Sequence, residues 1–416
     1  MSGVRRSVVI YACAFAVAGA TPFLLLPVLT RHLSPAQFGE VTSFLMFTAL
    51  LGNFASLSAH GFVSVRYFKT EPAAFAPLVG TALGVLALSH ALALATTGLL
   101  HPLLERVLDL PLAPSLLAVV AAFFMNLCLV WLALFQSSGQ PVRYLQARLI
   151  QGVLELGLGS VLVVWVLAEA WARTGSYTAA LGASAAFGAW MCHRRGLFTL
   201  RFERTQLKAL LAFGLPLLPH IVAGTTIGYL DRLVVSSLLG AESLGFYMVA
   251  MQIGMAMVAL TEPLNKALAP WLFEQLAKND EAVRRMIVRR TYLLFAALAL
   301  LGLVVAAAAH LLFEQLISPR YAPARALIPW MVGGFVLQGL YTSVVNYLFY
   351  AERTGRLSVA SATAAVMGCC VSWFMTTHHG LQGAAMSFAF NSAVLFLLVW
   401  ALAAKAVPMP WWPRAR

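Results

Sequence analysis

The chain has 416 residues, of which 61% are hydrophobic and 10% are charged, whereas soluble globular proteins carry about 25% charged residues. This composition excludes an ordinary soluble fold and predicts an all-α protein that crosses a membrane many times. The formal net charge of +13 would favour nucleic-acid binding in a soluble protein. In a membrane protein, the retention of Lys and Arg on the cytoplasmic side and their attraction to anionic lipids explain this net charge. We therefore expect no nucleic-acid partner.

Twelve apolar runs can be drawn along the chain, and most reach the ~20 residues that a helix needs to span hydrocarbon. In chain order they cover residues 8–30, 38–60, 77–100, 112–135, 147–168, 175–192, 209–235, 243–264, 291–313, 326–349, 357–377 and 381–404. The first run is longer than the apolar core of a cleavable signal peptide, which has about 7–15 residues. It is therefore predicted to be the first transmembrane helix.

Basic residues are divided unequally between alternate connections. All but six of the 28 Lys and Arg residues lie on the side that also holds both termini. The six exceptions are Arg31, Arg106, Arg173, Arg232, Arg320 and Arg325. Because Lys and Arg are retained in the cytoplasm, we expect an inner-membrane protein with both termini cytoplasmic.

An internal repeat divides the chain into halves. Residues 33–39 (LSPAQFG) and 239–245 (LGAESLG) both have Leu first and Gly seventh, and each precedes a new apolar run. Six spans per half would give parallel repeats related by a pseudo-twofold axis along the membrane normal. The predicted organisation is an N-terminal lobe at 1–192, a basic cytoplasmic linker at 193–208 and a C-terminal lobe at 209–416.

Prolines are predicted to interrupt the first and seventh helices, at Pro22 and Pro27 and at Pro216 and Pro219. Uncharged polar residues within the runs either line a hydrophilic path or form hydrogen bonds between helices. They are Asn53, His60, Asn126, Gln252, Gln338, Asn346 and Asn391.

Asp231 and Arg232 are adjacent charges predicted to lie about 9 Å inside the outer end of the seventh helix. A charge at that depth costs a few kcal/mol unless it is paired or faces water. We expect one or both to reach another helix or an aqueous cavity. An anchor at the outer membrane surface is the alternative.

Three further groups are candidates for coupling transport to an ion gradient. Glu155 is predicted near the cytoplasmic start of its helix, where it could also extend to the membrane surface. Imidazoles titrate near neutral pH, so His220 could be a proton-linked switch or only a hydrogen-bonding partner. Glu262 and Lys266 have i,i+4 spacing, which predicts an ion pair within one helix.

Several segments resemble one known family. They are residues 26–40 (LPVLTRHLSPAQFGE), 213–219 (FGLPLLP), 229–232 (YLDR) and 239–247 (LGAESLGFY). They resemble the bacterial polysaccharide-export, or oligosaccharide flippase, family of the multidrug/oligosaccharidyl-lipid/polysaccharide exporter superfamily. The resemblance implies about twelve helices in two lobes arranged in a V. It also implies export of undecaprenyl-diphosphate-linked repeat units for O-antigen, capsule or exopolysaccharide by alternating access.

With this resemblance, Arg31, Arg232 and Arg66 are expected to contact the diphosphate or sugar, and Asp231 to orient an arginine. The expected partners are the lipid-linked oligosaccharide, membrane lipids, and the glycan polymerase and chain-length machinery. No enzymatic activity, cofactor or metal is expected, because neither clustered carboxylates nor metal-ligand spacing is visible.

Three alternatives remain. A cation-coupled multidrug antiporter of the same superfamily would place acidic residues in its lobes, and the N-terminal half has only Glu155 well within an apolar run. A membrane-embedded glycan polymerase or glycosyltransferase would need a sizeable external loop or clustered carboxylates. A relative of the lipid II flippase would be expected to have fourteen runs rather than twelve.

Overall fold

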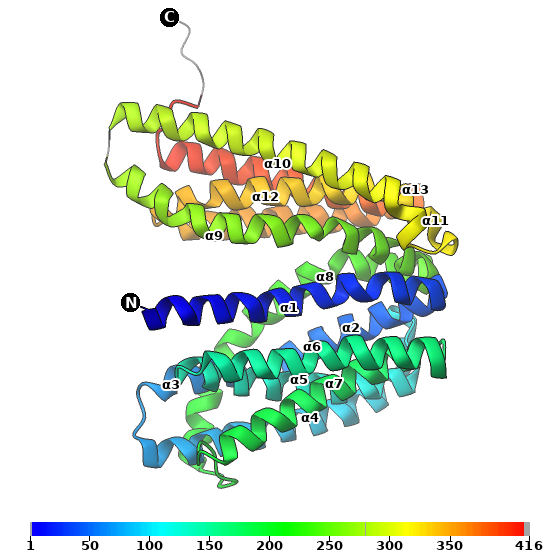
Figure 1. The fold of residues 1–416 in the computed structure, drawn as a ribbon, viewed down its shortest axis with the longest axis vertical. Coiled ribbons are helices and arrows are strands. Elements are labelled where there is room, and N and C mark those ends of the chain that lie inside the picture. The colour runs from blue at the N-terminus through cyan, green and yellow to red at the C-terminus, as the bar shows by residue number, and fades with distance from the viewer. Residues whose placement is uncertain (1, 279, 412–416) are drawn as a thin grey trace, which may run out of the picture. The chain divides into compact units, whose positions relative to one another are not determined.

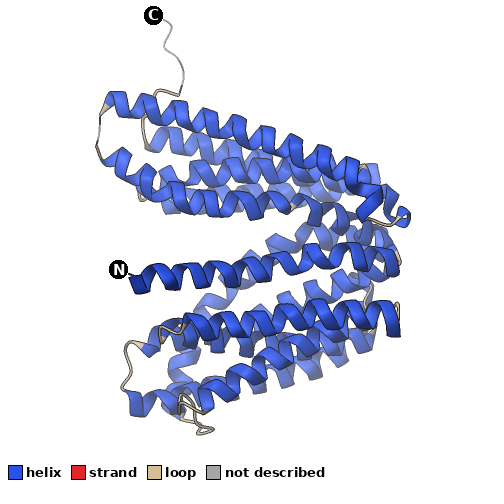
Figure 2. Ribbon diagram, viewed as in Figure 1, coloured by secondary structure: helices blue, strands red, loops and turns tan. Residues whose placement is uncertain are grey.

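The computed structural model describes residues 2–278 and 280–411, without the side chains of His220 and a small number of other residues. The described chain is helical, with short connections and no strand (Figure 2). It forms two compact units, Met1–Gly245 and Phe246–Arg416. The boundary between these units lies within a long helix, whereas the predicted lobes are separated by the basic linker. The lobe boundaries therefore stay a prediction.

The helices are labelled in Figure 1. Unit 1 contains α1 (Ser2–His32), α2 (Pro35–Ala55), α3 (Ala59–Tyr67), α4 (Pro72–Leu108), α5 (Leu112–Ser137), α6 (Pro141–Val161), the π-helical turn η1 (Leu162–Val166), α7 (Ala170–His193) and most of α8 (Arg204–Gly254). Unit 2 contains the end of α8, α9 (Ala256–Ala277), α10 (Glu281–Leu316), the 3-10 turn η2 (Pro319–Tyr321), α11 (Ala322–Arg325), α12 (Ile328–Tyr350) and α13 (Thr354–Ala406).

Breaks in the long helices occur at positive φ rather than at proline. Gly240 (φ 77°) interrupts α8 and Gly380 (φ 57°) interrupts α13. Leu57 and Ser58, with φ of 46° and 54°, separate α2 from α3. A left-handed residue redirects the helix, whereas a proline has a helical φ and removes one backbone hydrogen bond.

The predicted interruption of the first helix is wrong, because α1 continues through Pro22 and Pro27. In the seventh predicted helix, Pro216 and Pro219 likewise lie within helical residues of α8. Neighbouring helices can compensate a missing backbone bond inside a membrane protein. Proline positions were therefore a poor guide to where these helices end.

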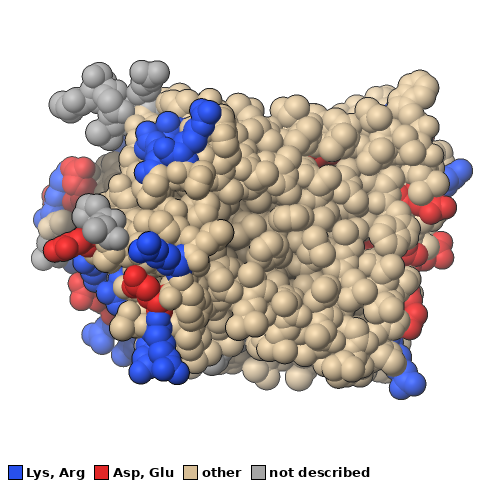
Figure 3. All heavy atoms as spheres, turned by 90° about the horizontal axis from the view of Figure 1, so that it is seen from below, with Lys and Arg blue, Asp and Glu red and all other residues tan. Residues whose placement is uncertain are grey.

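The described residues contain nine segments that are long and apolar enough to cross a membrane. Two of them, Gly228–Ala277 and Gly355–Ala406, have 50 and 52 residues, and each includes one glycine break. The helix α7 is not among the nine. The protein is therefore a multi-pass membrane protein, while the number of twelve spans stays a prediction. On the face drawn in Figure 3, charged side chains gather at the two ends and a wide uncharged band separates them.

The repeated motif forms a reciprocal contact in unit 1. A Cβ atom at Gly39 would collide with the carbonyl oxygen of Ala241, and one at Gly245 would collide with the carbonyl oxygen of Pro35. The offset that relates the two motifs also relates Pro35 to Ala241 and Gly39 to Gly245. The third and seventh residues of each copy thus pack against the seventh and third residues of the other, as expected for a local twofold relationship.

The helical segment that begins at Ala241 is capped from another helix. Its backbone N–H donates to Asp109 Oδ2 at 3.2 Å, and Asp109 itself ends α4 in a left-handed conformation. The start of α2 is capped locally by Ser34 and Gln37, which form a reciprocal capping box. Both copies of the repeat therefore have a satisfied helix start next to the glycine contact.

Candidate functional site

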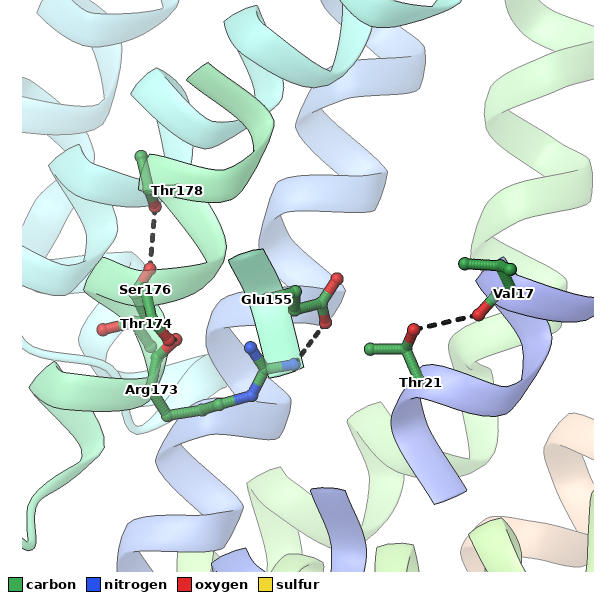
Figure 4. Close-up of polar contacts among 7 residues, drawn as sticks. All are labelled: Val17, Thr21, Glu155, Arg173, Thr174, Ser176 and Thr178. Atoms are coloured by element: carbon green, nitrogen blue, oxygen red, sulfur yellow. Dashed lines mark hydrogen bonds and ion pairs between the residues drawn. The ribbon is translucent and has the colours of Figure 1, made fainter. Parts of the chain in front are cut away.

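The most deeply buried charges in the described structure form one ion pair between α6 and α7. Arg173 Nη2 donates to Glu155 Oε1 at 2.6 Å. Their side chains are 6% and 9% exposed. The Arg173 guanidinium also lies 5.6 Å from the ring centre of Tyr177, one turn along α7. Figure 4 shows the two charged groups pointing toward each other, with Thr21 of α1 on the other side of the carboxylate.

The position of this pair corrects two expectations. Glu155 was expected near the cytoplasmic start of its helix, but it lies near the middle of the span Pro141–Val166. Arg173 was expected in an outer connection, but it lies in the first turn of α7. The helices α6 and α7 are antiparallel neighbours joined by the short connection after η1. The start of α7 is therefore close to α6, and the long Arg173 side chain reaches Glu155.

Glycines on α6 position the pair by allowing close helix packing. A Cβ at Gly152 would lie 2.9 Å from Val17 Cγ1 and 3.2 Å from Thr21 Oγ1. A Cβ at Gly159 would meet Leu25 of α1 and Ser176 of α7 at about van der Waals distance. Because residues three and four apart share a helix face, Glu155 lies on the same face as both glycines, between α1 and α7.

The electrostatics of the pair suit a mutually neutralised ion pair more than an open cation site. The Glu155 carboxylate is already neutralised by Arg173. The Nε and Nη1 atoms of Arg173 are buried and have no hydrogen-bond partner among the described residues. Removing either charge would leave the other one buried and uncompensated, which is strongly unfavourable. The sequence analysis did not predict Arg173 as the partner of Glu155. The available signal was that Arg173 follows the apolar run 147–168, in which Glu155 is the acidic residue well inside the run.

A second buried polar centre in unit 1 joins α2, α4 and α5. Asn126 Nδ2 donates to Gly52 O at 2.9 Å and lies 3.2 Å from His90 Nε2, while His90 Nδ1 lies 2.7 Å from Leu86 O. Asn126 therefore joins helices by hydrogen bonds. Asn53, the residue of α2 that follows Gly52, donates to Thr225 of α8 at 2.9 Å.

The four residues expected at the substrate do not form one cluster. Arg31 is in the last turn of α1, next to the start of α2, and Arg66 is in the last turn of α3. The helix α2 separates these positions, and its 21 residues alone span about 30 Å. One diphosphate group would not span that distance. Arg66 lies over the Phe62 ring, with 5.5 Å from its guanidinium carbon to the ring centre.

Asp231 and Arg232 are half-buried in α8. Arg232 Nη1 donates to Gly228 O at 3.3 Å, and the guanidinium lies 4.7 Å from the centre of the Tyr229 ring. Both residues are within three turns of the Gly240 break, toward the same end of the bundle as Arg31. Substrate contact by Arg31, Arg66, Asp231 and Arg232 stays a prediction.

The remaining coupling candidates differ in their surroundings. Glu262 Oε2 lies 3.0 Å from Lys266 Nζ within α9, so the predicted intrahelical ion pair is confirmed. Both side chains are exposed, at 55% and 75%, and such pairs contribute little to stability. The side chain of His220 lies outside the described residues.

Unit 2 contains a cavity of about 290 Å³ between α9, α10 and α12. Asn346 Nδ2 donates to Asn265 Oδ1 at 2.8 Å in its wall. Thr291 Oγ1 and Tyr347 Oη are 3.2 Å apart. Two amides, hydroxyl groups, aromatic side chains and Arg290 line the cavity together with leucines, and such a set can contact a polar head group. The sequence identifies Asn346 as a polar residue within an apolar run, whereas Asn265 is not among the predicted residues.

Comparison with known proteins adds the family. The model of a family described as polysaccharide biosynthesis protein matches residues 28–326. The chain belongs to this family. A Haemophilus influenzae protein of the Lsg locus is 24% identical over 389 residues, which cover 88% of this chain and 89% of the relative. Family membership confirms the resemblance seen in residues 26–40 and 213–247.

Solved structures with the same fold are transporters and flippases. An inward-facing multidrug resistance MATE family transporter of the MOP superfamily superimposes with a TM-score of 0.74 at 13% identity, covering 96% of this chain and 98% of the transporter. The lipid II flippase MurJ, in an inward closed conformation, gives 0.71 at 12% identity, covering 95% and 87%. At these identities the likeness shows that this polysaccharide biosynthesis protein shares the helical fold of those two structures.

Proposed function

We propose that this protein is a flippase that moves undecaprenyl-diphosphate-linked oligosaccharide repeat units across the bacterial inner membrane by alternating access. Both termini would be cytoplasmic, in agreement with the distribution of Lys and Arg. The observation that carries the proposal is the match to a polysaccharide biosynthesis family over residues 28–326. It occurs on a fold shared with a lipid II flippase and with multidrug transporters, so a transport role in glycan assembly explains both findings.

The buried ion pair favours this proposal over a cation-coupled multidrug antiporter. An antiporter needs a carboxylate that is free to bind a proton or a cation in part of its cycle. In the described part of unit 1 the acid in the middle of a span, Glu155, is held by Arg173 at 2.6 Å. A pair with no net charge is a poor site for a drug cation.

The polar residues have proposed roles in moving a large charged head group. Arg31, Arg66, Asp231 and Arg232 would contact it at different stages, because Arg31 and Arg66 are too far apart to act on one diphosphate. The amide pair of Asn265 and Asn346 would contact sugar hydroxyl groups. Glu155, His220 and Glu262 are the proposed coupling sites, and Glu155 would act through its pairing with Arg173.

The proposed partners are the glycan polymerase and the chain-length machinery that receive the repeat unit after translocation. We propose no catalytic role for the protein itself. The lipid carrier would stay in the bilayer while the polar head passes through the protein, because the acyl portion has no barrier to cross.

Deletion of the gene in its own host tests the function. The expected result is loss of one surface glycan, with its lipid-linked repeat unit accumulating in the cytoplasmic leaflet, and restoration of both by the wild-type gene. Asp231→Asn and Arg232→Ala variants should restore export poorly at wild-type protein levels in the membrane. Normal surface glycan in the deletion strain, together with increased sensitivity to cationic dyes, would support the antiporter instead.

A further inference from the structure

A second cavity in unit 2 lies between the beginning of α10 and the chain after α13. It has a volume of about 420 Å³, and its wall includes Arg285, Arg289, Tyr292 and Trp411. Tyr292 Oη donates to Trp411 O at 2.7 Å. The Trp411 ring packs edge-on against Tyr292, with 6.3 Å between ring centres. The last described residues are thus fixed to α10, and the cavity is a preformed feature of the fold.

The cavity lies at the polar end of an exposed apolar stripe. Arg285, Arg289 and Leu293 are spaced four residues apart on α10 and share one face. Farther along α10, Leu293, Leu300 and Leu311 are 60%, 62% and 75% exposed. In a membrane protein such leucines contact acyl chains, so the two arginines are at the level of the lipid head groups.

The rim of the cavity carries two arginines, and they differ in how the described protein pairs them. Arg289 is exposed and has no ion pair or hydrogen bond with the described residues. Arg285 pairs with Glu281 at 2.6 Å, but both side chains are at least 70% exposed, which makes the pair easy to exchange. Arg290, next to Arg289, lies 5.0 Å from the ring centre of Trp271 on the adjoining face.

We propose that this cavity binds the phosphate of an anionic glycerophospholipid, such as phosphatidylglycerol or cardiolipin. Arg289 and Arg285 would contact the phosphate oxygens through charge-assisted hydrogen bonds. Tyr292 and Trp411 would line the glycerol region, where amphipathic aromatic side chains are favoured. The acyl chains would follow the stripe that begins at Leu293. This site does not depend on the substrate that the protein transports.

Native mass spectrometry of the purified full-length protein tests the site. The protein is stripped of lipid in detergent and titrated with phosphatidylglycerol, cardiolipin, phosphatidylcholine or undecaprenyl phosphate. Wild type should retain one anionic phospholipid in preference to phosphatidylcholine. The R289Q variant should bind it about fivefold more weakly, since a basic residue near an anionic lipid contributes on the order of 1 kcal/mol, and R285Q/R289Q more weakly still.

The matched control is R353Q/R356Q, which removes two exposed charges from the start of α13, at its N-cap residue Arg353 and at Arg356 in its first turn. It should bind phosphatidylglycerol as wild type does. If both double variants lost phosphatidylglycerol binding equally, the binding would depend on overall positive charge and not on this cavity, which would overturn the proposal. Retention of undecaprenyl phosphate without phosphatidylglycerol would also overturn it, because the cavity would then belong to the transport route. Normal gel-filtration profiles of all variants exclude misfolding, and glycan export can be scored separately.

Discussion

The ion pair with Arg173 determines whether the buried carboxylate of Glu155 is available to bind a proton or a cation. Glu155 alone, in the middle of a membrane span, would be expected to bind a proton or a cation. With Arg173 at 2.6 Å the two charges compensate each other, and neither has to be moved into hydrocarbon alone. The spare Nε and Nη1 donors of Arg173 make the pair costly compared with apolar side chains. We therefore expect it to be kept for transport rather than for stability.

Breaking this pair gives a residue-scale prediction. Glu155→Gln should lower the free energy of unfolding by about 3–5 kcal/mol, because the Arg173 charge stays buried without its partner. The double variant E155Q/R173M should recover most of that loss. Thermal unfolding of the purified protein, followed by fluorescence, measures both effects.

Glu262→Gln is the matched control for this experiment, since it breaks an exposed pair worth about 0.3–0.5 kcal/mol. If E155Q is as stable as E262Q, the buried pair contributes no more to the free energy of unfolding than an exposed pair does. A stable E155Q/R173M protein that does not export glycan would place the pair in the transport cycle.

At the scale of helices, local spacing predicted contacts within one helix and failed for contacts between helices. The Glu262–Lys266 pair follows from i,i+4 spacing, which is a property of a single helix. The Glu155–Arg173 pair depends on the angle and rotation of α6 against α7, which no local pattern contains. Proline positions suggested breaks in α1, yet the chain bends at Gly240, Gly380 and Leu57–Ser58.

The glycine crossing between the two repeat copies makes an element-scale prediction. Gly39→Ala and Gly245→Ala should each destabilise the protein by about 1–3 kcal/mol, because the added methyl group collides with a rigid backbone carbonyl and forces the helices apart. Thermal unfolding in detergent measures the change. Gly98→Ala in α4 is the control, since a Cβ there meets nothing within 4 Å, and alanine should be neutral or stabilising. Equal effects at all three positions would refute the close crossing.

At the scale of the molecule, the orientation in the membrane is still a prediction from charge. In a cysteine-free background, an R320C variant should react with a membrane-impermeant maleimide added to the periplasmic side of cells with a permeabilised outer membrane. An L200C variant should react only after the inner membrane is opened. Arg320 and Leu200 are both exposed, so burial does not explain a difference. The opposite labelling pattern would place the termini outside.

Composition and hydropathy alone determined that this protein, with 61% hydrophobic residues, is a helical, multi-pass membrane protein. Uninterrupted apolar runs of about 20 residues have the length of membrane-spanning helices, which satisfy all their backbone hydrogen bonds within one segment. Short motifs at 26–40 and 213–247 were sufficient to identify its family. Only the tertiary structure decided which residues from different helices meet: Glu155 with Arg173, Asn265 with Asn346, and Gly39 with Ala241. These contacts depend on how helices far apart in the chain pack against one another, and hydropathy along the chain carries no information about that geometry.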